Sequence, residues 1–549
     1  MSMKSNSRRD FLRQSAASAA GAVACGVLPQ FGMLNAALAQ STISGYKALV
    51  CLYMSGGNDS FNMLIPTNPA RHDEYLLARG GIYSGNASAL GIPRVGGLAP
   101  GGSLPPALAL EGVEFGLNPA CTGMQNLYNQ GRLAFIANVA PLVEPVTRAT
   151  FNARRRPPQL FSHSDQTQLW NIGNSASSAS TEGWGGLLAG RINATSSLAG
   201  LPPCISLAGQ PRFLVGNRPS TGAPIKPYRI STNTTAPAPT PSGLSSTSTT
   251  NFESLRRQAV NQLMAEASTH PFTNEYGDIL ERSYSIGANV NTLIGTGGVY
   301  NALPSGTVFP ATNLGGQFAQ IIRMMNASKN SPLVQANRQV YYVDIGGWDT
   351  HSGQITAATP NATTGLWAGH QGLLQNVSNC IETFYRALAA LGMHNEVMLF
   401  SAAEFGRTIS SNGDGTDHGW GGVQFVVGGG QGNNASVAGD SGGGALLARN
   451  PATASGSGIY GRYPRISRDQ SDSPAIPDAE KGECFSSGRY LPTTSAEQMS
   501  ATLARWMGVD DNNIPLIFPN VDRYNDFTIA QGNLMAYTGR YVPMLQGTG

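Results

Sequence analysis

The chain has 549 residues, of which 41% are hydrophobic and 12% are charged, and it contains 67 glycines. This hydrophobic share is enough for a sizeable core and excludes a globally disordered chain. The formal net charge of +3, from 35 basic and 32 acidic residues, provides neither a basic face for nucleic acid nor an acidic tail. We therefore expect a large, glycine-rich globular protein that does not bind nucleic acid.

Residues 1–39 have the features of an export signal. Arg8 and Arg9 precede an apolar pair and a mild Ala/Gly/Val stretch over residues 16–28, and residues 37–39 supply small side chains at the cleavage positions. This pattern is typical of a twin-arginine signal peptide. We expect the twin-arginine translocase as a partner during export, and a periplasmic or extracellular location. No later stretch holds about 18 uninterrupted apolar residues, so no membrane span is expected after signal cleavage.

Five cysteines remain after residue 39, and their number and spacing argue against a disulfide framework. An odd number leaves at least one thiol unpaired, and no pair has the spacing of a zinc ribbon or a Cys-x-x-Cys motif. The five are Cys51, Cys121, Cys204, Cys380 and Cys484.

Short apolar runs bounded by glycine or polar turns alternate with segments of helical periodicity. The runs expected as buried strands are 48–54, 133–140, 204–208, 340–345, 397–402 and 423–427. Helices are expected over 252–267, 315–325 and 374–391. A further helix is expected from Thr494, where Glu497 completes a capping box. Strands that alternate with helices predict an α/β fold with a mostly parallel, doubly wound sheet.

Residues 231–251 form a low-complexity Ser/Thr/Pro tract, which is typical of a surface insertion or a flexible loop. The strand pattern resumes after this tract. We therefore expect residues 40–549 to form a single domain with long loops, rather than two domains that meet at the tract.

Polar side chains gather at the ends of the predicted strands, and open α/β sheets bind their ligands beyond the carboxyl ends of their strands. Most of the candidates follow a predicted strand, whereas Asp417 and His418 come just before the strand over 423–427. The candidates in chain order are Asp59, Ser162, Asp349, His351, Glu404, Arg407, Asp417 and His418. We expect these side chains to meet at one edge of the sheet.

Asp349 and His351 are two residues apart, so in an extended segment both side chains point the same way. They form an arm for a divalent cation such as zinc, manganese or calcium, in a centre of one or two ions. Such an ion lowers the pKa of water and neutralises charge on a transferring phosphoryl or sulfuryl group. The residues expected to complete the ligand set are Asp59, Glu404, Asp417 and His418.

Several of these residues also have a purely structural interpretation. Asp59 ends a Gly-Gly-Asn-Asp sequence that favours a turn, and the Asp417–His418 pair suits a turn cap. Ser162 lies at the expected start of a helix. There it is placed either for activation by a metal and by free helix amides, or as an ordinary N-cap.

Together these segments resemble a bacterial exported family known as domain of unknown function 1501. The family is grouped with the alkaline-phosphatase and sulfatase superfamily, which implies a three-layer α/β/α fold. The resemblance spans about residues 45–530. It is carried by Gly56-Gly57-Asn58-Asp59, Ser162-His163 with Gln166, Gly347-Trp348-Asp349-Thr350-His351, Glu404-Phe405-Gly406-Arg407-Thr408 and Gly415-Thr416-Asp417-His418-Gly419.

The resemblance implies a role for each of these positions. Asp59 would be the metal ligand after the first strand, and Ser162 would be the nucleophile. Asp349 and His351 would form one metal arm, and His418 would be the last ligand.

Two further positions follow from the same resemblance. Glu404 would stand where relatives carry an aspartate followed by a histidine, and in this chain Phe405 replaces that histidine. Arg407 would steady an anionic substrate.

The sequence thus predicts an exported, metal-dependent hydrolase of phosphate or sulfate esters, acting on a small anionic ester or on a surface polymer. The alternative is a catalytically degenerate exported binding or assembly protein on the same scaffold, which Phe405 and the long, weakly charged loops favour. A sugar or phosphate mutase on this scaffold is a third interpretation.

Overall fold

The computed structural model describes residues 45–196, 201–238, 251–265, 271–363, 365–432, 436–449, 456–466, 484–486, 488–526, 528–531 and 534–546. The expected signal peptide over 1–39, and residues 239–250 of the Ser/Thr/Pro tract, lie outside these ranges. Within the described ranges, no helix combines the length and the apolar character that crossing a membrane requires.

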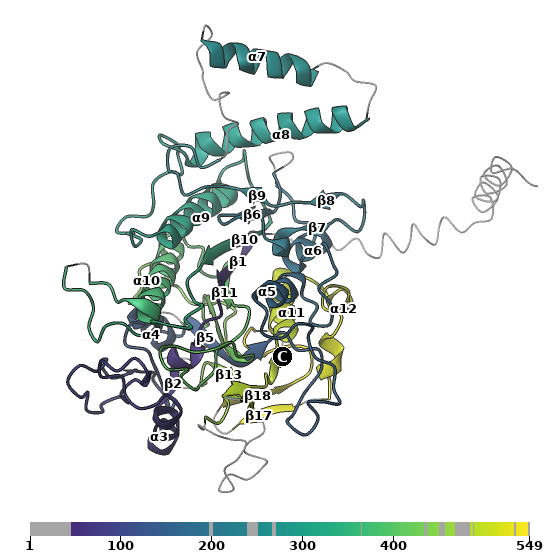
Figure 1. Cartoon of the computed structure of the whole chain (residues 1–549). Coiled ribbons are helices and arrows are strands. Elements are labelled where there is room, and N and C mark those ends of the chain that lie inside the picture. The colour runs from purple at the N-terminus through teal and green to yellow at the C-terminus, as the bar shows by residue number, and fades with distance from the viewer. Residues whose placement is uncertain are drawn as a thin grey trace, which may run out of the picture.

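A single 11-stranded sheet runs through the centre of the described part of the chain (Figure 1). The strand order is β17-β18-β13-β5-β12-β11-β1-β10-β6-β9, and β16 pairs with β5 off this path. The bounds are β1 Lys47–Met54, β5 Leu133–Ala140, β6 Cys204–Ser206, β9 Tyr228–Arg229, β10 Arg338–Ile345, β11 Val397–Ala402, β12 Gly422–Gly428, β13 Ile459–Gly461, β16 Thr494–Ser495, β17 Thr528–Gln531 and β18 Leu534–Thr538. All six runs predicted as strands lie in this sheet.

The sheet is mixed but mostly parallel. Strand β1 pairs in parallel with both β10 and β11, whereas β12 is antiparallel to β11 and to β5. Because β12 runs the opposite way, its first residues lie at the edge where β1, β10 and β11 end. The segment just before β12 therefore meets the loops that follow the parallel strands.

Both faces of the sheet are buried, because successive residues of a strand point to opposite sides. In β1, Val50 and Leu52 belong to one hydrophobic core, and Leu49 and Cys51 belong to the other. The first core is covered by α4 (Thr122–Asn129), α9 (Asn313–Asn330) and α10 (Gly369–Ala390). The second is covered by α5 (His163–Ile172), α6 (Trp184–Arg191), α11 (Ala496–Met507) and α12 (Ile514–Ile517). Figure 1 shows these two groups of helices on either side of the strands. The predicted α/β class is confirmed.

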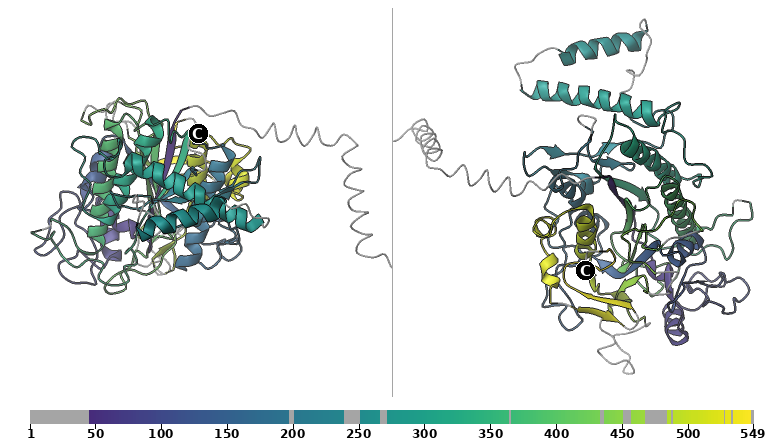
Figure 2. Two further views of the ribbon diagram at one scale, coloured as in Figure 1. Left: turned by 90° about the horizontal axis from the view of Figure 1, so that it is seen from above. Right: turned by 180° about the vertical axis from the view of Figure 1, so that it is seen from behind.

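The remaining helices and strands lie outside the central sheet and the helices that cover it. Helices α7 (Phe252–Ala265) and α8 (Pro271–Ile294) lie beside each other beyond the end of the sheet that carries β6 and β9 (Figure 2). The others are α3 Pro69–Ala78, η1 Ser60–Asn62, η2 Arg212–Leu214 and η3 Val521–Tyr524, with the small strands β2 Leu64–Pro66, β3 Leu108–Ala109, β4 Phe115–Leu117, β7 Gly216–Asn217, β8 Pro224–Ile225, β14 Cys484–Ser486 and β15 Arg489–Tyr490.

The expected capping box of α11 is displaced by one residue. Thr494 belongs to β16, where it pairs with Val139 of β5, so the N-cap falls on Ser495 and the box is completed by Gln498. Glu497 is instead buried and accepts hydrogen bonds from the backbone N–H groups of Ser175 and Asn520. Strand pairing thus decides where the helix begins.

The cysteine side chains that the structure describes are free thiols in the core. They are Cys51, Cys121, Cys204 and Cys380. Burial raises the pKa of the Cys380 thiol to about 12, so it stays protonated at neutral pH.

His370, in the first turn of α10, is a fully buried histidine behind the loops of the sheet edge. Its Nε2 lies 2.9 Å from Asn58 Oδ1, and its ring meets that of Trp348 edge-on. An amide oxygen only accepts, so Nε2 carries the hydrogen and donates it to Asn58. Burial lowers the pKa of His370 to about 4, and the folded protein therefore holds this imidazole neutral.

We expect His370 to make the protein less stable in mild acid. Between the ordinary histidine pKa of about 6.5 and pH about 4, the unfolded chain binds a proton at His370 but the folded chain does not. The free energy of unfolding therefore falls by up to about 3 kcal/mol as the pH is lowered through this window. A His370→Gln variant keeps a donor for Asn58 but does not titrate. Urea unfolding at pH 7 and pH 4.5 should show that the free energy of unfolding falls less in the variant than in the wild-type protein. An equal fall in both proteins would contradict this assignment.

Candidate functional site

The loops at the carboxyl ends of β1, β10 and β11 meet the segment before β12 and the start of α5. Close backbone packing brings them together. Gly56 has a φ of +121°, and a Cβ at this position would collide with the backbone N of Asp349. Only glycine fits a site that combines a positive φ with such close approach. Gly56 therefore sets the position of the Asp349 arm.

His351 and His418 face each other across this edge. Their Nε2 atoms are 2.9 Å apart, and they lie 3.2 Å and 3.3 Å, respectively, from Asp349 Oδ1. One ion bound to such atoms with bonds of about 2.0–2.1 Å would hold them about 3 Å apart. The three atoms therefore have the spacing of ligands around one metal.

The hydrogen bonds behind the two rings decide which nitrogens carry hydrogen. His418 Nδ1 lies 2.8 Å from the carbonyl oxygen of Phe161, and His351 Nδ1 lies 3.2 Å from Asp417 Oδ1. Both partners only accept, so each Nδ1 carries the hydrogen, and in the neutral rings each Nε2 presents a lone pair. Two lone pairs at this separation repel each other unless a proton or a metal ion lies between them. This arrangement fits a divalent metal ion.

His163, the first residue of α5, supplies a third imidazole. Its Nε2 is buried without a hydrogen-bond partner among the described residues and lies 3.5 Å from Asp349 Oδ2. Ligand atoms of His163, Asp349 and His418 all lie within 4.8 Å of one another. Behind the ring, His163 Nδ1 lies 3.4 Å from Glu404 Oε1. This hydrogen bond to Glu404 is the main cause that raises the pKa of His163.

The candidate donors are His163, Asp349 and His418, whose ligand atoms lie within 4.8 Å of one another, and His351, whose Nε2 lies next to His418 and Asp349. Imidazole suits zinc, whereas calcium and manganese prefer oxygen ligands. Of the three metals that the sequence suggested, zinc therefore fits these residues best. Asp349 and His351 are each 45% exposed, so the centre opens to solvent.

Arg407 holds Asp349 in place. Its side chain is fully buried, and Nη1 donates to Asp349 Oδ1 at 2.9 Å and to the carbonyl oxygen of Gly56 at 3.0 Å. Nε and Nη2 donate to Thr416. Partial burial opposes ionisation of Asp349, but the hydrogen bond and charge of Arg407, with the nearby histidines, outweigh it and lower the pKa of Asp349. Its contacts make Arg407 a positioning residue, whereas the resemblance suggested an anion-binding one.

Glu404 and Asp417 stand behind the histidines. Glu404 is 4% exposed, and its carboxylate accepts the backbone N–H of Gly56, at 2.8 Å and 3.0 Å, and that of Gly57 at 3.0 Å. Asp417 accepts from Asn412 Nδ2 at 3.0 Å as well as from His351. Both residues were expected as metal ligands, and in the structure they are hydrogen-bond partners of the candidate ligands His163 and His351.

Asp59 lies in a buried ion pair. Its two carboxylate oxygens accept from Arg79 Nη2 at 2.7 Å and from Gln354 Nε2 at 2.6 Å, and both Asp59 and Arg79 are fully buried. Both oxygens of Asp59 are thus already occupied by hydrogen bonds from buried side chains. Gln354 in turn accepts from Thr416 Oγ1 at 2.8 Å, which connects Asp59 to the segment that Arg407 binds. These contacts support the structural interpretation of Asp59.

Ser162 is the N-cap of α5, as the sequence suggested. Its hydroxyl donates to Asp165 Oδ2 at 2.6 Å, and its Oγ accepts weakly from the backbone N–H of Asp165 at 3.5 Å. Phe161, just before it, has a φ of +74°. Among the described residues, Ser162 Oγ makes its hydrogen bonds within its own helix turn, beside His163 but not to the metal-ligating atoms.

Phe405 forms the apolar wall of the centre. The ring is 3% exposed, and its centroid lies 4.6 Å from that of His418 and 4.9 Å from that of His163. The position that carries a histidine in the resembling superfamily thus packs against two of the imidazoles. Phe405 offers no metal ligand, so on its side of the centre only the rings of His163 and His418 can reach an ion.

His163 is the site residue that sequence reasoning missed. It lies in Ser162-His163-Ser164, next to the expected nucleophile, where adjacent residues seldom face the same point. Its position as the first residue of a helix could have indicated it, because a helix that begins at the sheet edge has its first turn next to the site.

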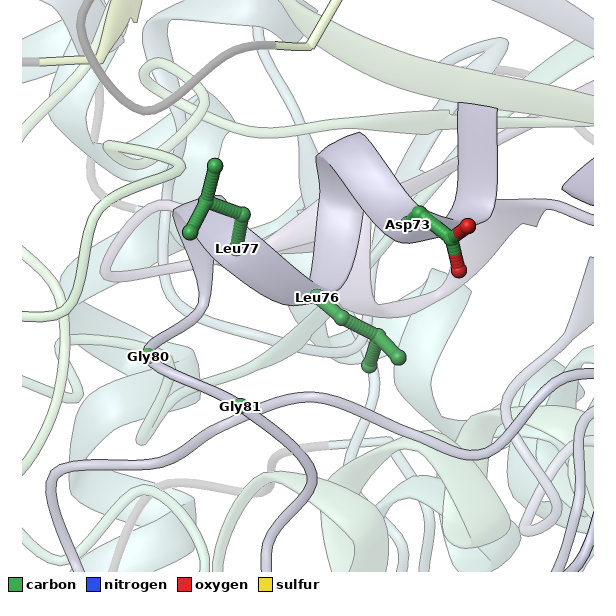
Figure 3. A pocket seen from close by; sticks show the side chains of 5 residues that line it. All are labelled: Asp73, Leu76, Leu77, Gly80 and Gly81. Atoms are coloured by element: carbon green, nitrogen blue, oxygen red, sulfur yellow. The ribbon is translucent and has the colours of Figure 1, made fainter. Parts of the chain in front are cut away.

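A separate pocket of about 450 Å³ lies on the surface at the end of α3. Figure 3 shows its lining, formed by Asp73, Leu76, Leu77, Gly80 and Gly81. None of the site residues lines this pocket.

We expect the purified protein to bind one zinc or manganese ion through His163, His351, His418 and Asp349. Replacing His351 or His418 by alanine should weaken zinc binding at least about 100-fold, and Glu404→Gln or Asp417→Asn should weaken it about 10–100-fold through loss of ring orientation. Competition titration with a chromophoric chelator measures these affinities.

Asp59→Asn and Ser164→Ala are the matched controls. The first leaves Arg79 buried and unpaired, so it should cost about 3–5 kcal/mol of unfolding free energy but leave zinc affinity in the folded protein unchanged. The second should change neither quantity. Zinc affinity that survives in His351→Ala and His418→Ala, but falls in Asp59→Asn, would reverse the ligand assignment.

The family comparison covers the segment that carries most of this site. A family model described as "Protein of unknown function (DUF1501)" matches residues 326–446, which contain β10, α10, β11 and β12. The matched segment includes Asp349, His351, Glu404, Arg407, Asp417 and His418. No curated protein matches the chain significantly. The match supports the resemblance of this chain to the domain of unknown function 1501 family.

Proposed function

We propose that this protein is an exported, metal-dependent hydrolase of phosphate or sulfate esters, built on an alkaline-phosphatase-like α/β/α scaffold. The observation that carries the proposal is the meeting of three imidazoles and one ionised carboxylate at a solvent-open sheet edge. The twin-arginine pattern of residues 1–39 supports the export part of the proposal. A small anionic ester or a surface polymer is the proposed substrate.

His163, His351, His418 and Asp349 would hold the ion. When bound, a divalent ion supplies Lewis-acid chemistry, which polarises a phosphoryl or sulfuryl group and offsets the charge that develops on it. Arg407 keeps Asp349 ionised and in position, since it is buried against that carboxylate.

Ser162 is the proposed nucleophile. Its Oγ–H donates to Asp165 Oδ2 at 2.6 Å, so the carboxylate of Asp165 would take this proton as Oγ attacks the phosphorus or sulfur and the P–O or S–O bond to the ester alcohol breaks. The alcohol would leave with a proton from Asp165 or water, and water would then cleave the serine ester to release the inorganic anion. The oxygen lies at the first turn of α5, where free backbone N–H groups and the helix dipole favour negative charge. His163, the next residue, brings the same turn to the metal centre.

The second candidate function is a binding or assembly role with a structural metal. Four protein donors fill a tetrahedral zinc shell, whereas catalytic zinc usually keeps one position open. Arg407, which the resemblance suggested for the substrate anion, is fully buried against Asp349, Gly56 and Thr416. These two observations favour this alternative, and turnover separates it from the hydrolase.

We expect the zinc- or manganese-loaded protein to hydrolyse p-nitrophenyl phosphate or p-nitrophenyl sulfate. Ser162→Ala should lower kcat at least about 100-fold with metal content unchanged, because the nucleophile is lost and the ligands remain. Ser220→Ala, at an exposed serine outside this turn, is the control and should keep full activity. A loaded wild-type protein that turns over neither ester, nor any of a wider ester panel, would favour the binding role.

A further inference from the structure

A metal-dependent hydrolase of anionic esters gains from a charged hydrogen-bond donor that reaches the substrate beside the metal, and Arg407 does not provide one. That side chain is fully buried, and its donors bind Asp349, Gly56 and Thr416. A second arginine, Arg489 at the start of β15, lies beside His418. It is half-buried.

Two contacts hold the Arg489 guanidinium next to the metal-ligating residues. Its Nε donates to the carbonyl oxygen of His418 at 2.9 Å. Its Cζ also lies 5.1 Å from the ring centroid of Phe161, within the range of a cation–π contact. Phe161 in turn accepts the hydrogen of His418 Nδ1 through its carbonyl oxygen. Arg489, Phe161 and His418 thus hold one another, and Ser162 follows Phe161 in the chain.

The two terminal nitrogens of Arg489 are available to a ligand. Within the described part of the chain, no carboxylate forms an ion pair with Arg489, and its one hydrogen bond is made by Nε. A guanidinium held by Nε and by an aromatic face presents its two Nη atoms in a fixed fork. That fork matches two oxygens of a tetrahedral oxyanion.

We propose that Arg489 binds the phosphoryl or sulfuryl oxygens of the substrate, beside the metal centre, and so determines the preference for anionic esters. This inference rests on the proposed function for its substrate class. It assigns to Arg489 the role that the resemblance gave to Arg407.

The test uses inorganic phosphate and inorganic sulfate as probes of the zinc-loaded protein. Isothermal titration calorimetry should show that Arg489→Gln weakens binding of the preferred anion about 10–100-fold, as expected for loss of charge-assisted hydrogen bonds. Arg489→Lys should restore only part of the affinity, because lysine lacks the fork. Zinc content should be unchanged in both variants, which shows that the centre is intact.

Arg155→Gln is the matched control for general charge. Arg155 is exposed and lies seven residues before Ser162, in the loop that leads to α5. Its loss should change anion affinity less than about twofold, because physiological salt screens an exposed charge such as this one. The inference is wrong if zinc-loaded wild-type protein binds neither anion, if Arg489→Gln binds as tightly as wild type, or if Arg155→Gln loses as much affinity as Arg489→Gln.

Failure of this inference and failure of the proposed function give different results. Anion binding that depends on Arg489 without any ester turnover would contradict the hydrolase but keep the anion site. Turnover with unchanged KM and anion affinity in Arg489→Gln would keep the hydrolase and remove Arg489 from substrate binding.

Discussion

The buried guanidinium of Arg407 joins three segments that come from distant parts of the chain. It donates to the loop after β1 through Gly56, to the arm after β10 through Asp349, and to the segment before β12 through Thr416. A buried charge must be paired and hydrogen-bonded, so these contacts cannot be loosened independently. The candidate ligand atoms are positioned by the same contacts, because Asp349 Oδ1 is both the partner of Arg407 and the neighbour of His351 and His418. The fully buried side chain of Arg407 thus fixes the position of the candidate centre from the protein interior.

The direction of β12 is the second constraint. His418 precedes its strand, and in an all-parallel sheet it would lie at the opposite edge from Asp349. Because β12 is antiparallel to β11 and β5, His418 reaches the edge where β1, β10 and β11 end. The sequence predicted a mostly parallel sheet and also predicted His418 at this edge. Because β12 is antiparallel, the sheet can be mostly parallel and His418 can still lie at the same edge as Asp349.

The parts of the site that could be predicted from sequence are those that depend on local pattern. Strand β10 is an apolar run, and the two-residue spacing of Asp349 and His351 places both at its carboxyl end. The roles of Glu404 and Asp59 could not be read in this way. The role of each carboxylate depends on a buried partner from another part of the fold. The partner of Glu404 is the backbone amide of Gly56, 348 residues away, and the partner of Asp59 is Arg79, from the segment after α3. His163 was missed for a similar reason, because its ring meets Asp349 only through the packing of α5 against the sheet edge.

The candidate centre stands or falls with the binding of a single metal ion by three imidazoles and one carboxylate at this edge. X-ray absorption spectroscopy of the zinc-loaded protein tests it directly. We expect one zinc ion per chain, with nitrogen and oxygen ligands at about 2.0–2.1 Å and the outer-shell scattering of three imidazole rings, falling to two rings in His163→Ala. Zinc without imidazole scattering, or a folded protein that retains no transition metal, would contradict the account.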